Sequence, residues 1–228
     1  MKRLLLVLIL SLSSMYANAQ AALLVLLFGD QLATETFHLS IDAGANYREW
    51  NLENGDPAWG WHFGLGTHYQ FAEKWQLVAE FTPLNGGGAR NTPALTNLPI
   101  GIDSLLSNRT NQWQINTIDV PVLIRYSLTP QLHLATGPVF SFITSAKEIR
   151  RAEYFTGETI TTEADIMEQF HSLQYGWSAD LSYSLSDARK GKGMHVRLRY
   201  SSFFNNALQS GQGRLGQIQG ILTFPFIL

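Results

Sequence analysis

Seven charged side chains of this chain could form a buried ionic network, because all of them fall on the polar face of segments that alternate between apolar and polar residues. Four are carboxylates and three are guanidinium groups. Opposite charges held away from bulk water should pair, since an unpaired buried charge is costly. We predict a salt-bridged polar network that fills an interior, made of Asp42, Glu80, Asp119, Arg125, Asp180, Arg197 and Arg199.

Histidines on the same polar face raise the alternative of a metal site or a proton relay. They lie on different segments, except for His62 and His68, which share one. At ~3.3 Å per residue of strand, these two lie about 20 Å apart, too far to share an ion. We therefore expect no metal and no cofactor, and hydrogen-bonded interior histidines at His38, His62, His68, His133 and His195.

Several residues near the ends of the alternating segments raise the alternative of catalysis, because a carboxylate or nucleophile beside a histidine can activate water. They match no recognised catalytic motif. The nearby run Asn85–Arg90 lacks the Lys and the Ser or Thr of a P-loop, so we interpret it as the start of a flexible loop. The acidic segment Ala146–Phe170 lacks calcium-loop spacing. We expect no enzyme, with a rim-active lipid- or peptide-modifying enzyme as the alternative, built on Glu49, Asp56, Asp165, Glu168, His171 and Ser172.

The N-terminus and the composition indicate an exported protein. Lys2 and Arg3 precede an apolar run, and small residues at Ala17 and Ala19 suit a signal peptidase, so residues 1–19 are predicted to be a cleaved signal peptide. Charged residues make up 15% of the chain, against about 25% in an ordinary soluble domain. The absence of cysteine excludes a disulfide framework, and a net charge of -2 gives no reason to expect nucleic acid.

Eight segments alternate with the period of two that is typical of strands. We predict that they form one domain over residues 37–228, preceded by an apolar linker at 20–36. The prediction is an all-β fold, an eight-stranded antiparallel up-and-down transmembrane β-barrel. The segments are Phe37–Tyr47, Trp59–Phe71, Trp75–Leu84, Trp113–Leu128, Gln131–Ser145, Leu173–Tyr183, Met194–Ser201 and Leu215–Leu228.

The connections between these segments alternate between short and long, as the periplasmic turns and extracellular loops of an outer-membrane barrel do. The short ones are Ala72–Lys74, Thr129–Pro130 and Ser186–Gly193, and the long ones are Arg48–Ala58, Asn85–Gln112, Ala146–Phe170 and Asn205–Arg214. Aromatic residues gather toward the strand ends, as in two interfacial girdles. One girdle would hold Phe37, Tyr69, Trp75, Tyr126, Tyr183 and Phe226, and the other Tyr47, Trp59, Trp61, Trp113, Phe142, Tyr175 and Phe204. A soluble lipocalin-like binder, with apolar residues inside, is the remaining alternative.

The chain resembles the PorT-like outer-membrane β-barrel family of Bacteroidota. The resemblance rests on Leu27–Asp30, Thr34–Phe37, Phe81–Leu84, Ile118–Tyr126 and Ala135–Pro138. It implies an outer-membrane barrel without a catalytic motif, and the name-giving member is associated with the type IX secretion pathway.

These observations predict a non-enzymatic integral protein of the outer membrane. It would act as a structural or accessory protein, a narrow pore, or part of a secretion or surface assembly. The expected partners are outer-membrane lipid and proteins that contact the extracellular loops, and no nucleic acid.

Overall fold

The computed structural model describes residues 36–51, 55–96, 106–154, 157–185 and 193–226. The predicted signal peptide at 1–19, most of the predicted linker at 20–36 and the C-terminal Leu228 lie outside these residues.

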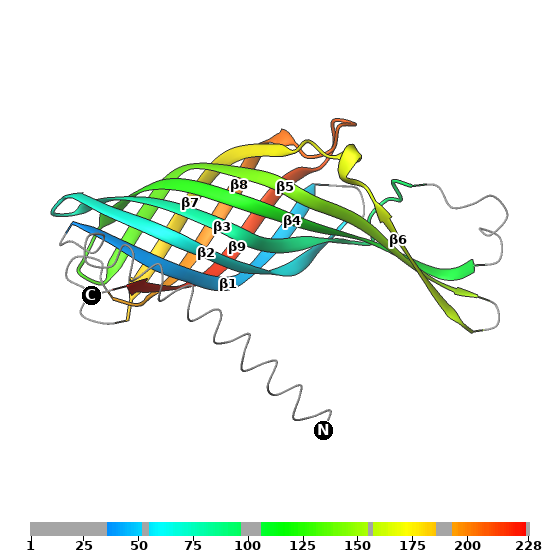
Figure 1. Ribbon diagram of the computed structural model, residues 1–228, viewed down its shortest axis with the longest axis horizontal. Helices are drawn as coiled ribbons and strands as arrows, with labels where there is room; N and C mark the ends of the chain where they lie inside the picture. Colours follow the sequence, from blue (N-terminus) through cyan, green and yellow to red (C-terminus); the bar gives the residue numbers. More distant parts are fainter. Residues whose placement is uncertain (1–35, 52–54, 97–105, 155–156, 186–192, 227–228) are drawn as a thin grey trace, which may run out of the picture.

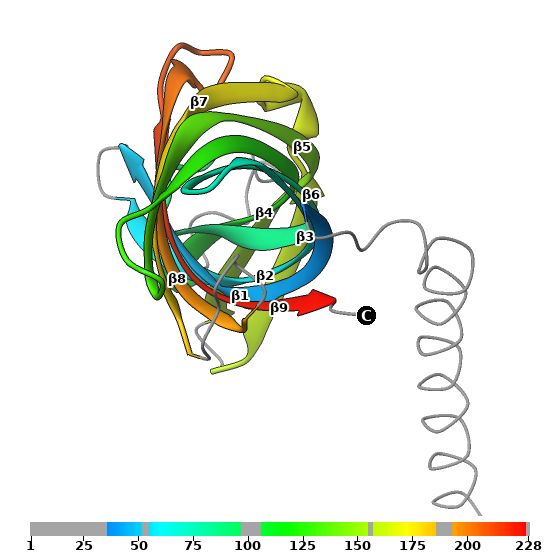
Figure 2. The same cartoon turned by 90° about the vertical axis from the view of Figure 1, so that its left-hand side faces the viewer.

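Eight of the nine strands in the described residues close into a ring, because β1 pairs with both β2 and β9, and β4 pairs with β5. All pairings are antiparallel, and Figure 2 shows the closed ring along its long axis. The predicted eight-stranded up-and-down barrel is confirmed. The ring consists of β1 (Phe37–Asn51), β2 (Asp56–Ala72), β3 (Trp75–Arg90), β4 (Leu106–Ser127), β5 (Leu132–Tyr154), β7 (Leu173–Ser184), β8 (His195–Asn206) and β9 (Arg214–Phe226).

The strands run further toward the outer end than the sequence predicted. Strands β4 and β5 have 22 and 23 residues, whereas ~9–11 suffice to cross a membrane. Their outer halves form a sheet with β6 (Thr159–Asp165), which pairs with β5 beyond the ring. We call this three-stranded projection the extracellular extension, after the orientation predicted for the barrel; it lies at the far right in Figure 1.

The run Asn85–Arg90, predicted to be a flexible loop, is instead the outer end of β3, so that prediction is wrong. Its residues pair in register with β4, from Asn85 opposite Thr117 to Arg90 opposite Gln112. Glycine permits this pairing at Gly88, where a Cβ atom would lie 1.8 Å from the carbonyl oxygen of Trp113. The close approach of the two backbones therefore explains the glycine at position 88.

Polar side chains point into the ring and apolar side chains point outward. Along β7, for example, Gln174, Ser178 and Asp180 are buried, while Trp177 and Leu181 are exposed. Among the described large apolar residues, Trp61 is the most exposed, at 81%, and only a lipid environment accommodates a whole belt of such residues. The lipocalin-like alternative requires the opposite arrangement and is excluded. Among the described residues, no helix is long and apolar enough to cross a membrane.

Outward-facing aromatic pairs occur near both ends of the barrel. Trp75 packs on Tyr126 at one end, with ring centroids 4.7 Å apart, and Tyr47 packs on Trp59 at the other, at 5.1 Å. Trp113 does not belong to the outer girdle as predicted, because its side chain is 2% exposed and points inward. It lies on the odd-numbered face of β4, together with the buried Ile115.

Gly44 lies on β1 next to the backbone of β9. A Cβ atom there would lie 2.0 Å from the carbonyl oxygen of Gly220. We expect Gly44→Ala to lower the free energy of unfolding by about 1–3 kcal/mol, because a backbone oxygen has to shift. Denaturant titration of the protein in lipid vesicles measures this loss. Gly220→Ala is the matched control, since nothing lies within 4 Å of its added Cβ, and equal losses at both positions would contradict the explanation.

Candidate functional site

Five of the seven predicted network residues meet in the middle of the barrel, and we call them the ionic cluster. Arg197 donates to Asp42 at 3.4 Å, to Glu80 at 2.5 Å and to Asp180 at 2.6 Å. Arg199 donates to Glu80 at 2.8 and 2.7 Å and to Asp180 at 3.0 Å. Since Glu80 lies on β3 and the two arginines lie on β8, on opposite sides of the ring, the bonds to Glu80 cross the lumen. Both guanidinium groups are almost completely buried.

Asp119 lies outside the ionic cluster, in a neighbouring layer of amides and hydroxyls. It accepts hydrogen bonds from Asn85, from Ser141 at 2.5 Å and from Gln217 at 3.2 Å. The nearby guanidinium is Arg48, which donates to Gln217 at 3.1 Å and to Thr117 at 2.6 Å. Arg48 was not among the predicted network residues, because Arg48–Ala58 was predicted to be a loop. The signal was present, since the buried even-numbered residues of β1 continue beyond Tyr47.

Arg125 lies on the other side of the ionic cluster, toward the periplasmic end. Its guanidinium contacts His68 at 3.5 Å and Gln76 at 3.2 Å. His68 stacks on His38, with ring centroids 4.5 Å apart, because the two residues pair directly across β1 and β2. The spacing of histidines along one strand does not reveal this contact, which forms between neighbouring strands. In the described residues, no group of three or more His, Asp or Glu side chains is placed to hold a metal ion.

The outer mouth of the barrel is filled by aromatic side chains, and we call the trio Trp50, Trp113 and Phe170 the aromatic lid. Phe170 packs edge-on against Trp50 and Trp113, with centroids 6.0 and 5.6 Å away. It follows the 3-10 helix η2 (Met167–Gln169), so a connecting segment folds inward to supply it. All three rings are buried. The lumen is therefore crossed by a histidine layer, the ionic cluster, an amide layer and this lid.

The candidate catalytic residues of the rim do not form a catalytic constellation. Asp165 accepts from the backbone of Met167 at 2.8 Å, and Asp56 accepts from Asn91 at 2.6 Å. His171 and Ser172 line a rim cavity of about 360 Å³. Within the described part of the chain, the His171 ring makes no recorded hydrogen bond with a carboxylate or a hydroxyl. Glu49 and Glu168 are exposed.

Glu148 organises the extracellular extension, outside the membrane-spanning part of β5. Its buried carboxylate accepts from the backbone of Leu95 at 2.9 Å and of Thr96 at 3.1 Å. It also accepts from Asn111 at 2.8 Å and pairs with Arg150 at 2.8 Å. Glu148 thereby fastens the segment that follows β3 to β4 and β5. No motif in the sequence indicated this role.

Burial alone would raise the pKa of Glu148, but hydrogen bonds from Thr96, Leu95, Asn111 and Arg150 outweigh it and lower this pKa below its usual 4.5. A lowered pKa in the folded state means that the stabilising contribution is complete above about pH 4.5 and is lost as the pH falls through the lower value.

We expect amide protection at Leu95 and Thr96 to fall on acidification below pH 4.5, when measured as exchange protection factors. Glu148→Gln should lose much of this protection at neutral pH and show no further acid-dependent change. Protection that is constant with pH in the unmodified protein would contradict the role of the carboxylate.

A closed antiparallel ring with a polar interior and an apolar belt defines a transmembrane β-barrel. The sequence profile of the family described as "Outer membrane protein beta-barrel domain" matches residues 18–209. The chain belongs to this outer-membrane family, and its place is the outer membrane. No curated protein sequence matches it significantly.

Several solved outer-membrane proteins have a similar fold at low sequence identity. Ail, the attachment invasion locus protein of Yersinia pestis, is 11% identical, with a TM-score of 0.43 over 85% of this chain and 100% of that one. Neisserial surface protein A is 10% identical, with a TM-score of 0.44 over 83% and 97% of the two chains. OprG from Pseudomonas aeruginosa is 11% identical, with a TM-score of 0.44 over 85% and 97%.

Proposed function

We propose that this protein is a non-enzymatic, closed barrel that holds its extracellular extension above the outer membrane for contact with surface partners. The observation that carries the proposal is that buried side chains cross the lumen at several levels. Buried arginines of the ionic cluster join strands on opposite sides of the barrel, and the aromatic lid covers the outer mouth. Side chains just about fill an eight-stranded barrel, so this interior favours a scaffold over a solute channel.

Planar-bilayer recording tests the closed lumen. The purified full chain should show no large, steady conductance in a salt solution, because Arg197 and Arg199 on β8 reach across the lumen to Glu80 on β3. A stable open level at every applied voltage would overturn the proposal and favour the narrow-pore alternative.

Cysteine scanning tests the role of the extracellular extension, and the chain suits it because it contains no cysteine. Thr161 is an exposed residue of β6, and Thr129 is exposed in a turn at the opposite end of the barrel. A cysteine at Thr161, and not one at Thr129, should react with a membrane-impermeant maleimide on intact cells. A photocrosslinker attached at Thr161 should then capture a surface component. Labelling of Thr129 alone would reverse the topology and overturn the proposal.

Membership of the PorT-like group, and with it a part in type IX secretion, belongs to this proposal. Its support is the resemblance of Ile118–Tyr126 and Ala135–Pro138, which lie side by side on β4 and β5. A crosslinked component of a secretion assembly would support this finer assignment. Crosslinks to unrelated surface proteins alone would count against it.

Export through a cleaved signal peptide at residues 1–19 is also part of the proposal. N-terminal sequencing of the protein from outer-membrane fractions should begin at Gln20, and a start at Met1 would refute cleavage.

A further inference from the structure

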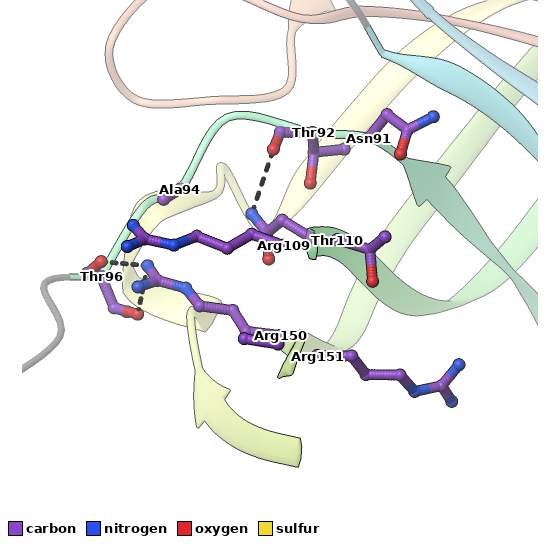
Figure 3. A pocket seen from close by; sticks show the side chains of 10 residues that line it. Asn91, Thr92, Ala94, Thr96, Arg109, Thr110, Arg150 and Arg151 are labelled. Carbon is purple, nitrogen blue, oxygen red and sulfur yellow. Dashed lines mark hydrogen bonds between the residues drawn. The ribbon is translucent and has the colours of Figure 1, made fainter. Parts of the chain in front are cut away.

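The extracellular extension contains a cavity of about 490 Å³ with a basic lining. It lies between the segment that follows β3 and the outer halves of β4 and β5 (Figure 3). Its described lining residues include arginines and no carboxylate. Glu148, the acidic residue behind the wall, is already bonded to Arg150 and to the segment at Thr96. Because Arg109 and Arg151 line the cavity in addition to the Arg150–Glu148 pair, the described lining carries an excess of positive charge.

Two arginines direct their charge to the same end of this cavity. Figure 3 shows the side chains of Arg109 and Arg150 extending toward Thr96, whereas that of Arg151 points the other way. Arg150 is fixed in place, since it donates to the hydroxyl of Thr96 at 2.9 Å and its side chain is 14% exposed. Arg109 is exposed. A guanidinium held in place beside an exposed one suits an anionic group with several acceptor oxygens.

Polar atoms with unmet hydrogen-bonding capacity surround the same cavity. Among the described residues, the buried Thr92 Oγ1, Asn111 Oδ1 and Arg150 Nε have no hydrogen-bond partner. All three residues line the cavity. Buried polar atoms normally have partners, so the exceptions call for a specific cause. Because the set includes both donors and acceptors, a bare anion satisfies it less well than a polyhydroxylated ligand.

The height of the cavity indicates where such a ligand resides. Phe142 is the last exposed aromatic of the lipid-facing belt on β5, and Arg150 lies eight residues further along this strand. Eight residues span about 26 Å at ~3.3 Å each. With a strand tilt of ~45°, the cavity lies about 19 Å above the girdle. Sugars of the outer leaflet occupy this level, beyond the acyl chains.

We propose that this cavity binds a phosphorylated saccharide of the outer leaflet, with Arg109 and Arg150 holding the phosphate and Thr92 and Asn111 holding sugar hydroxyls. The site goes beyond the proposed closed-barrel role and needs only the extracellular extension. A conducting barrel would therefore leave it intact, and a failure to bind would leave the closed lumen intact.

Isothermal titration calorimetry of the full chain in nanodiscs tests the site. The probe is a lipid-free phosphorylated core oligosaccharide released from lipopolysaccharide, compared with the same oligosaccharide after dephosphorylation and with inorganic phosphate. We expect the phosphorylated oligosaccharide to bind at least about tenfold more tightly than either comparison ligand, since charge-assisted bonds and hydroxyl contacts both contribute. Equal affinities for the phosphorylated and dephosphorylated forms, or for the oligosaccharide and inorganic phosphate, would overturn the assignment.

Arg109→Gln should weaken binding of the phosphorylated oligosaccharide about tenfold, because it removes one guanidinium without touching the Glu148 contacts. Arg214→Gln is the matched control, since it removes one exposed positive charge of the same rim outside the cavity. Equal effects of the two variants would show that the oligosaccharide is attracted nonspecifically by the positive charge of the rim, and would refute the site. Nanodiscs that contain lipopolysaccharide should suppress the titration by occupying the cavity from the membrane. Unsuppressed binding would overturn the outer-leaflet source.

Discussion

Arg197→Met should lower the free energy of unfolding of this barrel by about 3–5 kcal/mol. Arg197 is the residue that contacts all three carboxylates of the ionic cluster, at Asp42, Glu80 and Asp180. Arg199 still reaches Glu80 and Asp180 after the substitution, but it makes no recorded contact with Asp42. The cost arises because a carboxylate remains buried without its cation, and not because an ion pair is intrinsically worth so much.

Equilibrium unfolding in lipid vesicles, followed by tryptophan fluorescence, measures the predicted loss. Arg214→Met is the matched control, since it makes the same change at an exposed rim position and should alter stability by no more than about 0.5 kcal/mol. The double variant Arg197→Met with Asp42→Asn should be less destabilised than the sum of the two single variants, because the second change removes the stranded charge. Strict additivity of the two changes would contradict this explanation.

The faces of the strands could be read from the sequence, and the reason is physical. A membrane-spanning strand has lipid on one side and a polar lumen on the other, so its residues alternate between apolar and polar along the chain. The alternation of Leu173–Tyr183 and of Leu215–Phe224 therefore predicted the correct faces. The same rule, continued beyond Tyr47, would have placed Arg48 and Trp50 inside.

The outer ends of the strands could not be read in this way. Beyond the membrane, Leu106–Gln112 and Lys147–Tyr154 have no lipid-facing side, so no apolar stripe marks them as strand. The buried position of Glu148 could not be predicted for the same reason.

Contacts across the lumen were also beyond the sequence. The alternation of each strand predicted that Glu80, Arg197 and Arg199 point into the lumen. Which carboxylate meets which guanidinium depends on the stagger of β3 against β8. The ring geometry groups Asp119 with Arg48 and leaves Arg125 among histidines. The sequence therefore predicts which charged residues lie inside the barrel. How these residues group into layers follows only from the three-dimensional structure.

Phe170→Ala should open the aromatic lid and cost about 3–5 kcal/mol of local stability, the range for deleting a buried phenylalanine. The ring packs edge-on against both Trp50 and Trp113, and its segment is fastened by bonds from Ile166 to Ala146 and from His171 to Ala207. Because the lid is carried by a connecting segment, the loss should appear as local opening rather than as unfolding of the ring. Hydrogen exchange at Ile166 and His171 should accelerate, and acrylamide should quench tryptophan fluorescence more strongly.

Phe204→Ala is the matched control, because it deletes the same side chain from the lipid-facing side, where Phe204 is 56% exposed. It should leave exchange at Ile166 and His171 unchanged, and equal acceleration in both variants would contradict a lid formed by Phe170. The conductance of Phe170→Ala separates the two barriers of the lumen. We expect it to stay near zero, because Arg197 and Arg199 still join β8 to Glu80 on β3 beneath the opened lid. A conductance that appears on removal of Phe170 alone would assign closure to the lid instead of the ionic cluster.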